Sequence, residues 1–316
     1  MERRDILKSA AAVGAGMGLL VGGEQALAAG AQPGEAKGKG KGKPGPFIRT
    51  RDGGELFYRD WGTGRPVVFL SGWTLTSEMW GYQMVPLSEQ GLRCIAYDRR
   101  GHGQSTDPGR GYDYDTLADD LAAVLEALDL RDVTLVGHSM AAGEMVRYLS
   151  RHGSGRIARL AFVAPANTPF LLKTPDNPDG VDASVFEYLR NQLLLRDFPG
   201  WLSANARPFV VADTSAAMVE WLIDQMRRCS MKAVIDCNRA MTSTDFRAEL
   251  PRIRLPTLVL HGTVDASAPL ELTGRKTAAL IPGARLEVYE GAPHGLFVTH
   301  LDRLNSDLLA FAKGGG

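Results

Sequence analysis

The sequence predicts an α/β fold in which a mainly parallel sheet carries helices on both faces. Short apolar and β-branched runs at residues 66–70, 92–97 and 132–137 are typical of strands buried inside such a sheet. Between them lie segments with apolar residues at helical spacing, such as residues 114–128. This alternation of strands and helices is the pattern of a doubly wound sheet.

The same signals place the other elements along the chain. Residues 55–61 form the first predicted strand, which ends at Gly62-Thr63-Gly64 because glycine favours tight turns. Further apolar runs predict strands at residues 157–163, 256–260 and 286–289. Helical spacing predicts helices at residues 84–90, 142–151, 270–280 and 296–313.

Residues 167–244 interrupt this alternation. They are mostly helical in pattern, rich in Phe, Leu, Met and Trp, and they begin with Pro- and Asp-rich turns at residues 175–178. Doubly wound sheets bind their ligands at the carboxyl edge of the strands, and an insertion here would cover that edge. We therefore expect a helical cap over the ligand site.

The N-terminal segment is expected to lie outside the folded domain at residues 47–316. Residues 1–28 carry a twin arginine, a weakly apolar Gly/Ala-rich run and an A-x-A cleavage site, which is typical of a bacterial twin-arginine signal peptide. The run is too short and too rich in glycine to span a bilayer. Residues 29–46, in which lysine and glycine alternate at residues 37–43, favour a flexible linker. We expect the protein to be exported, either to the periplasm or as a secreted protein.

Composition excludes several function classes. The 36 basic and 36 acidic residues balance, so nothing indicates a nucleic-acid partner. Three cysteines cannot form a disulfide framework. Cys229 and Cys237, if they share one helix, would lie about 12 Å apart, too far to bridge. No spacing typical of a metal site occurs in the sequence, and an apolar fraction of 44% suits a globular domain with a sizeable core.

The segment Gly137-His138-Ser139-Met140-Ala141 is close to the G-x-S-x-G elbow. This elbow is a strained turn between a strand and a helix that holds a serine hydroxyl clear of the sheet. The alternative is a chance Gly/Ser turn in a strand–helix unit, and the five residues alone do not decide between the two. The elbow makes Ser139 the candidate nucleophile.

A serine hydroxyl needs a base to deprotonate it and an acid to orient that base. Asp265 follows the predicted strand at residues 256–260, and His294 follows the one at residues 286–289. Each has a simpler reading, Asp265 as a helix N-cap and His294 as an N-cap or a surface loop residue. Both occur in the chain order Ser, Asp, His that such an elbow requires, so we predict a triad with Ser139.

A tetrahedral oxyanion also needs hydrogen-bond donors. The backbone N–H of Met140, directly after the nucleophile, is the first candidate. The second is the N–H of Trp73, in the loop after the strand at residues 66–70, where Gly72 permits a tight turn. The alternative for Trp73 is a core aromatic, a role that its ring could fill in either case. The other histidines, including His102, His138, His152, His261 and His300, are expected to have structural roles.

Five motifs together resemble the α/β-hydrolase superfamily, and within it the branch of bacterial arylesterases and cofactor-free (non-haem) chloroperoxidases. They are residues 69–73, 97–105, 137–140, 261–265 and 291–295. The likeness covers about residues 47–313 and implies an eight-stranded, doubly wound sheet with a helical cap. It also implies Ser139 as nucleophile, His294 as base, Asp265 as orienting acid, and Trp73 and Met140 as oxyanion donors, with no cofactor or metal.

Three positions depart from the pattern of these relatives. Ser71 stands where many carry histidine before the Gly-Trp pair, and Ala141 replaces the second glycine of the elbow. Thr74 follows Trp73 where peracid-forming relatives often carry proline, which weakens an assignment to perhydrolase or haloperoxidase chemistry. The first two departures would reshape the pocket without removing the triad.

The sequence therefore favours a serine hydrolase that cleaves carboxylic esters or lactones of small to medium hydrophobic substrates through an acyl-enzyme. A second hypothesis is cofactor-free perhydrolysis by the same triad. A third, from another class, is a non-catalytic binding protein on the hydrolase scaffold, because a fold alone does not give a function. Dehalogenase and epoxide-hydrolase chemistry need a carboxylate nucleophile where this chain has Ser139.

Overall fold

The structure, a computed structural model, describes residues 45–315. The predicted signal peptide at residues 1–28, and all of the predicted linker except its last two residues, lie outside this range. Among the described residues, no helix has both the length and the apolar character needed to cross a membrane.

Eight strands form one sheet in the order β1-β2-β4-β3-β5-β6-β7-β8. The pairs β1–β2 and β2–β4 are antiparallel, and all other neighbours are parallel. The mainly parallel, eight-stranded sheet is thereby confirmed. The strands are β1 (Phe47–Arg49), β2 (Glu55–Trp61), β3 (Arg65–Leu70), β4 (Leu92–Tyr97), β5 (Val133–His138), β6 (Ile157–Val163), β7 (Thr257–Gly262) and β8 (Arg285–Tyr289).

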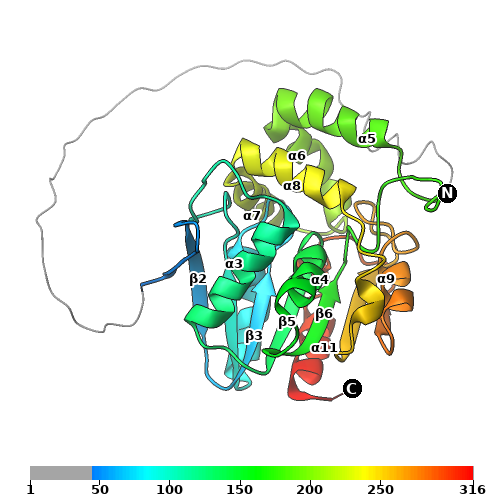
Figure 1. The fold of residues 1–316 in the computed structure, drawn as a ribbon. Helices are drawn as coiled ribbons and strands as arrows, with labels where there is room; N and C mark the ends of the chain where they lie inside the picture. Colours follow the sequence, from blue (N-terminus) through cyan, green and yellow to red (C-terminus); the bar gives the residue numbers. More distant parts are fainter. Residues whose placement is uncertain (1–44, 316) are drawn as a thin grey trace, which may run out of the picture. The chain divides into compact units, whose positions relative to one another are not determined.

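Helices cover both faces of the sheet (Figure 1), with α3 and α4 packed together on one face and α11 behind the sheet in this view. The helices between strands are α2 (Gly81–Glu89), α3 (Tyr114–Ala127), α4 (Ala141–His152) and α9 (Gly274–Leu280), with 3₁₀ turns η1 (Ser77–Trp80) and η3 (Leu250–Arg252). Helices α10 (Leu296–Thr299) and α11 (Leu301–Lys313) follow the last strand.

The segment predicted as a cap contains a helical group between β6 and β7, which lies together at one end of the sheet in Figure 1. Its elements are α5 (Ala183–Tyr188), the π-helix η2 (Leu189–Leu194), α6 (Leu195–Phe209), α7 (Ala216–Arg227) and α8 (Met231–Ser243). Within α6 the backbone of Asp197 is non-helical (φ −156°, ψ 77°), and its carboxylate accepts the N–H of Gly200 at 2.8 Å. This helix therefore has a kink at Asp197.

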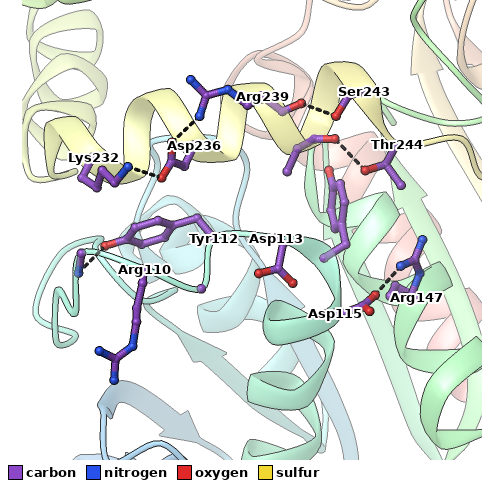
Figure 2. Close-up of a pocket in the computed structure, with 14 residues that line it drawn as sticks. Arg110, Tyr112, Asp113, Asp115, Arg147, Lys232, Asp236, Arg239, Ser243 and Thr244 are labelled. Carbon is purple, nitrogen blue, oxygen red and sulfur yellow. Dashed lines mark hydrogen bonds and ion pairs between the residues drawn. The ribbon is translucent and has the colours of Figure 1, made fainter.

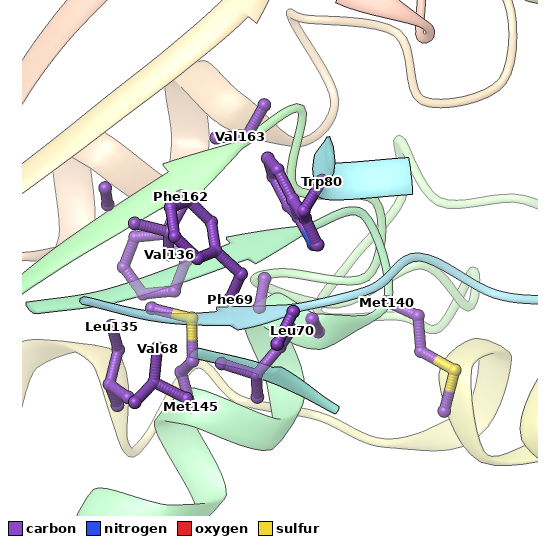
Figure 3. Packing of buried hydrophobic residues seen from close by; sticks show 14 of the residues in the cluster. Val68, Phe69, Leu70, Trp80, Leu135, Val136, Met140, Met145, Phe162 and Val163 are labelled. Carbon is purple, nitrogen blue, oxygen red and sulfur yellow. The ribbon is translucent and has the colours of Figure 1, made fainter. Parts of the chain in front are cut away.

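The core lies where the central strands meet the helices. All six residues of β5 and of β7 are buried, as expected for parallel strands covered on both faces. Figure 3 shows apolar side chains of β3, β5 and β6 packed together with Trp80 of η1 and Met145 of α4. These buried strands are the frame from which the loops at the carboxyl edge project.

Several local expectations differ from the structure. The last predicted helix is two helices, because His300 leaves the helical region (φ −127°, ψ 44°) between α10 and α11. Helix α9 begins only at Gly274. Cys229 precedes α8, so it does not share a helix with Cys237, and both thiols are free and buried.

Candidate active site

The elbow at Ser139 is a left-handed turn between β5 and α4. Ser139 has φ 56°, a conformation that costs an L-residue about 1–2 kcal/mol. A Cβ on Gly137 would stand 2.3 Å from Sδ of Met145 and 3.2 Å from Cβ of Ala141. The alanine at position 141 therefore fits because position 137 has no side chain. The strained turn leaves Ser139 beside the first turn of α4.

The structure brings Ser139, Asp265 and His294 together from three loops. Nε2 of His294 lies 2.9 Å from Oγ of Ser139, and Nδ1 of His294 lies 2.7 Å from Oδ2 of Asp265. An ionised carboxylate only accepts hydrogen bonds, so Nδ1 carries the proton and Nε2 is free to accept one from the hydroxyl. All three side chains are buried, with Ser139 5% exposed. This is the geometry of a nucleophile, a base and an orienting acid.

The two carboxylate oxygens of Asp265 have separate partners. Oδ2 faces His294, while Oδ1 accepts the backbone N–H groups of Ser267 at 2.9 Å and Ala268 at 2.7 Å. Oδ1 of Asp265 thus accepts backbone N–H groups as the side chain of a helix N-cap would, although no helix begins there. Burial alone would raise the pKa of Asp265, but the electrostatic interaction with His294 and hydrogen bonds from two histidines hold it well below its usual range. The carboxylate therefore stays ionised.

His261 is the second of these histidines, and sequence reasoning missed it. Its Nε2 lies 3.1 Å from Oδ2 of Asp265 and 2.8 Å from the carbonyl oxygen of Ala268. A carbonyl cannot donate, so Nε2 carries the hydrogen that points at both oxygens. The signal that could have found it is the spacing of four residues between His261 and Asp265 across the end of β7.

His138, the variable residue of the elbow, also contacts the site. Its Nε2 donates to the backbone carbonyl oxygen of His294 at 3.0 Å, while its Nδ1 is buried without a partner among residues 45–315. Burial, and then the neighbouring His294, lower the pKa of His138 well below its usual range. His138 is therefore a neutral donor that holds the loop carrying His294.

Of the two predicted oxyanion donors, Trp73 lies in the loop after β3 and Met140 is the N-cap residue of α4. In the part of the chain that the structure describes, the backbone N–H groups of Trp73 and Met140 donate to no other group. The ring of Trp73 packs against the helical segment, with its indole N–H on the carbonyl oxygen of Val234 at 3.0 Å. Its ring centroid lies 5.7 Å from that of Trp201. The alternative role of Trp73 as a packed aromatic thus applies to its ring and leaves its backbone N–H free.

The three departures from the relatives' pattern have local explanations. Ser71 turns its hydroxyl onto the carbonyl oxygen of Thr76 at 2.8 Å, inside its own loop. Thr74 has φ 66°, and its hydroxyl donates to the carbonyl oxygen of Trp73 at 2.6 Å. Proline is locked near φ −65°, so it could not take the place of Thr74 without a change in the backbone. Ala141 fits against Gly137 as described above.

A separate cavity of about 600 Å³ lies between the start of α3 and helix α8 (Figure 2). None of the predicted site residues lines it. Its charged side chains pair with one another: Lys232 and Arg239 bind Asp236, and Arg147 binds Asp115. Within residues 45–315, no group of three or more His, Cys, Asp or Glu side chains could hold a metal ion. Two of these ion pairs lie within α8, and the third joins α4 to α3.

Comparisons with known proteins agree with this fold. Residues 65–301 match the family described as the alpha/beta hydrolase fold. A non-heme chloroperoxidase of Kitasatospora aureofaciens is 44% identical over 84% of this chain and 98% of its own length. A bifunctional esterase/perhydrolase of Acinetobacter calcoaceticus is 38% identical over 84% and 99%. The solved esterase of Exiguobacterium antarcticum is 32% identical, with a TM-score of 0.82 over 86% of this chain and all of its own. The chain therefore belongs to the α/β-hydrolase superfamily, in the branch of non-haem chloroperoxidases and esterases.

Proposed function

We propose that this protein is a serine hydrolase that cleaves carboxylic esters or lactones of small to medium hydrophobic substrates. The observation that carries the proposal is the 2.9 Å contact between Nε2 of His294 and Oγ of Ser139, with Asp265 on the far nitrogen. The esterase and the bifunctional esterase/perhydrolase among the relatives support it.

The proposed reaction follows from the tautomer of His294. Its bare Nε2 accepts the hydroxyl proton as Oγ of Ser139 bonds to the carbonyl carbon, and the carbonyl π-electrons move to oxygen. The N–H groups of Trp73 and Met140 stabilise this oxyanion. When the oxyanion collapses, the C–O bond to the alcohol breaks and His294 gives that oxygen its proton. Water then attacks the acyl-enzyme with the same base, releasing the acid and restoring Ser139.

Aromatic rings around the triad support an apolar substrate. The ring of Phe209, at the end of α6, has its centroid 5.4 Å from that of His294. Trp201 packs edge-on against Trp73 and stacks on Phe198, with centroids 6.3 Å apart. Apolar surfaces of this kind favour acyl or aromatic groups over charged ones.

The decisive experiment replaces Ser139 with alanine. Ser139→Ala should abolish hydrolysis of a graded series of p-nitrophenyl esters and lactones, while the exposed Ser203→Ala retains it. A fluorophosphonate probe should label the wild type and Ser203→Ala but not Ser139→Ala. Undiminished turnover by Ser139→Ala would exclude the assignment, and a wild type that neither turns over esters nor reacts with the probe would favour a binding protein.

Perhydrolysis by the same triad is the second candidate, because several relatives are named chloroperoxidases, haloperoxidases or perhydrolases. Peroxide would replace water as the acyl acceptor and release a peracid. We rank it second because Thr74 stands where peracid-forming relatives often carry proline, and its φ of 66° excludes proline from this backbone. Peroxide-dependent halogenation of a dye, measured beside ester cleavage, separates the two activities.

We also propose that the protein is exported by the twin-arginine route, which the sequence of residues 1–28 supports. Replacing Arg3 and Arg4 with lysine in the full chain should move the protein from the exported to the cytoplasmic fraction. A wild-type chain that stays in the cytoplasm would exclude export.

A further inference from the structure

Arg99 connects the two backbone segments that carry the proposed oxyanion donors. It follows β4, and its side chain is 3% exposed. One terminal guanidinium nitrogen donates to the carbonyl oxygen of Ser71 at 2.6 Å, and the other donates to that of Gly72 at 3.3 Å. Its Nε donates to Oε1 of Glu144 at 2.7 Å. One planar cation therefore contacts both the loop before Trp73 and the helix after Ser139.

Glu144 fixes the other side of this contact. It lies in the first turn of α4, the helix that begins directly after Met140, and its side chain is 1% exposed. A buried charge without a partner is strongly unfavourable, so the guanidinium and the carboxylate hold each other in place. The planar fork of arginine also fixes the angle of the contact, which a lysine could not do. The pair thereby ties the first turn of α4 to the loop at residues 71–73.

The direction of the Trp73 N–H follows from the carbonyl group that Arg99 binds. Among residues 45–315 the cis peptide bond is Thr168–Pro169, so the bond from Gly72 to Trp73 is trans. In a planar trans peptide the C=O and N–H groups point in opposite directions. Arg99, with the N–H of Leu75 at 3.2 Å, holds the Gly72 oxygen on one side. The N–H of Trp73 therefore points to the opposite side.

We propose that Arg99 is a positioning residue for ester hydrolysis, whose guanidinium, paired with Glu144, sets the N–H of Trp73 relative to that of Met140. The proposal rests on the proposed hydrolase function. An oxyanion forms only as the substrate is attacked, so a misaligned donor lowers kcat and leaves KM nearly unchanged. A purely structural role would instead lower stability and leave the kinetics of the folded fraction intact.

The neighbouring residue provides a matched control. Arg100 is also buried, 4% exposed, and its guanidinium binds Asp120 of α3 at 2.6 and 2.7 Å. Its other partners are Asp52 and the carbonyl oxygen of Arg110. Arg100 thus makes an ion pair of similar burial to that of Arg99, from the next position in the chain, and none of its hydrogen bonds reaches the loop at residues 71–73 or helix α4.

The experiment compares Arg99→Lys with Arg100→Lys. For each folded variant we would measure Tm, kcat and KM for a p-nitrophenyl ester, and the inhibition constant of a trifluoromethyl ketone, whose adduct carries an oxyanion. Arg99→Lys should lower kcat by roughly 10–100-fold, with KM within about threefold of the wild-type value. It should raise the inhibition constant of the ketone by a factor similar to the loss of kcat. Arg100→Lys should lower Tm comparably and keep kcat and the inhibition constant within about twofold of the wild type.

Equal kinetic losses in the two variants would overturn the proposal, and so would a loss of kcat in Arg99→Lys with unchanged affinity for the ketone. If Arg99→Lys does not fold, Glu144→Gln against Asp120→Asn makes the same comparison with the guanidinium kept. A smaller loss, about 3–10-fold in kcat, is then expected for Glu144→Gln only, since the neutral amide still accepts one hydrogen bond. Equal kinetic behaviour of this second pair would also overturn the proposal.

Ser139→Ala, assayed in parallel, tests the proposed hydrolase function separately from the proposed role of Arg99. If Ser139→Ala keeps its turnover, the proposed function itself is wrong. If Ser139→Ala is inactive and Arg99→Lys hydrolyses esters as fast as the wild type, the function stands and the role of Arg99 is wrong.

Discussion

The imidazole rings of His138 and His294 lie against each other, with centroids 4.7 Å apart. Nε2 of His138 donates to the backbone carbonyl oxygen of His294 at 3.0 Å. His138 precedes the proposed nucleophile, and His294 is the proposed base. The elbow that presents Ser139 therefore also holds the loop that must bring the imidazole to it.

Removal of this hydrogen bond should slow catalysis more than it loosens the fold. His138→Phe keeps a buried ring but leaves the carbonyl of His294 unpaired, and we expect kcat to fall about tenfold, the equivalent of one lost hydrogen bond. His138→Gln, whose amide N–H can reach the same oxygen, should recover most of that loss. Steady-state kinetics and Tm of both variants test this, and a fully active His138→Phe would contradict it.

Gly72 lies against the Nδ1 edge of His138, whereas Nε2 of His138 binds the carbonyl of His294. A Cβ at Gly72 would stand 2.5 Å from Nδ1 of His138 and 3.4 Å from Cβ of Ser139. Gly72→Ala must therefore displace either the oxyanion loop or the elbow, and a shift of about 1 Å costs on the order of 100-fold in rate. Gly81→Ala is the control, because nothing lies within 4 Å of a Cβ there and it has an ordinary helical φ of −53°. If both alanine variants have equal kcat, the close approach at Gly72 has no functional role.

Asp265 should respond to substitution far more strongly than His261. Asp265→Asn removes the charge that holds Nδ1 of His294 protonated, and a fall in kcat of about 10⁴-fold is expected from the wrong tautomer. His261→Gln removes an imidazole but keeps an N–H donor for Oδ2 of Asp265, so we expect a loss of about threefold or less. His261→Ala, which removes the donor, should fall between the two. Kinetics at a pH where the wild type is fully active provide the comparison.

The parts of this molecule that the sequence predicts are those with a local signal. Apolar runs in the sequence predict the buried strands, and β4 begins and ends at the predicted residues Leu92 and Tyr97. Ser139, Asp265 and His294 are found because each follows such a strand and their chain order is fixed by the chemistry. These three residues meet, with Nε2 of His294 2.9 Å from Oγ of Ser139, because the parallel strands that they follow end at one edge of one sheet.

The parts that the sequence does not predict depend on contacts between distant segments. His138 and Arg99 have ordinary local contexts, and their importance comes from partners on other loops, such as the carbonyl of Ser71, 28 residues from Arg99. The break at His300 has no proline or glycine to indicate it. Three-residue β1 is too short to carry a pattern, and it is defined by its pairing with β2.

His102 should make the protein sensitive to mild acid. It is fully buried, its Nδ1 donates to the carbonyl oxygen of Arg100 at 2.9 Å, and its Nε2 has no partner among residues 45–315. Burial, and then the charge of Arg99, lower the pKa of His102 to about 3 from the usual 6.5. The unfolded chain therefore takes up this proton near pH 6.5, whereas the native protein resists it until about pH 3.

Because the unfolded state binds more protons in that window, this group weakens the fold as the pH falls from 6.5 towards 3, by up to about 1.4 kcal/mol per pH unit. His102→Asn keeps a donor at the position of Nδ1 and has no titrating ring. We expect it to lower the free energy of unfolding at pH 8, through lost packing, and to reduce the slope of that free energy between pH 5.5 and 4 by about 1.4 kcal/mol per unit. Urea unfolding at three pH values measures the slope, and parallel curves for the variant and the wild type would show that His102 is protonated in the native state.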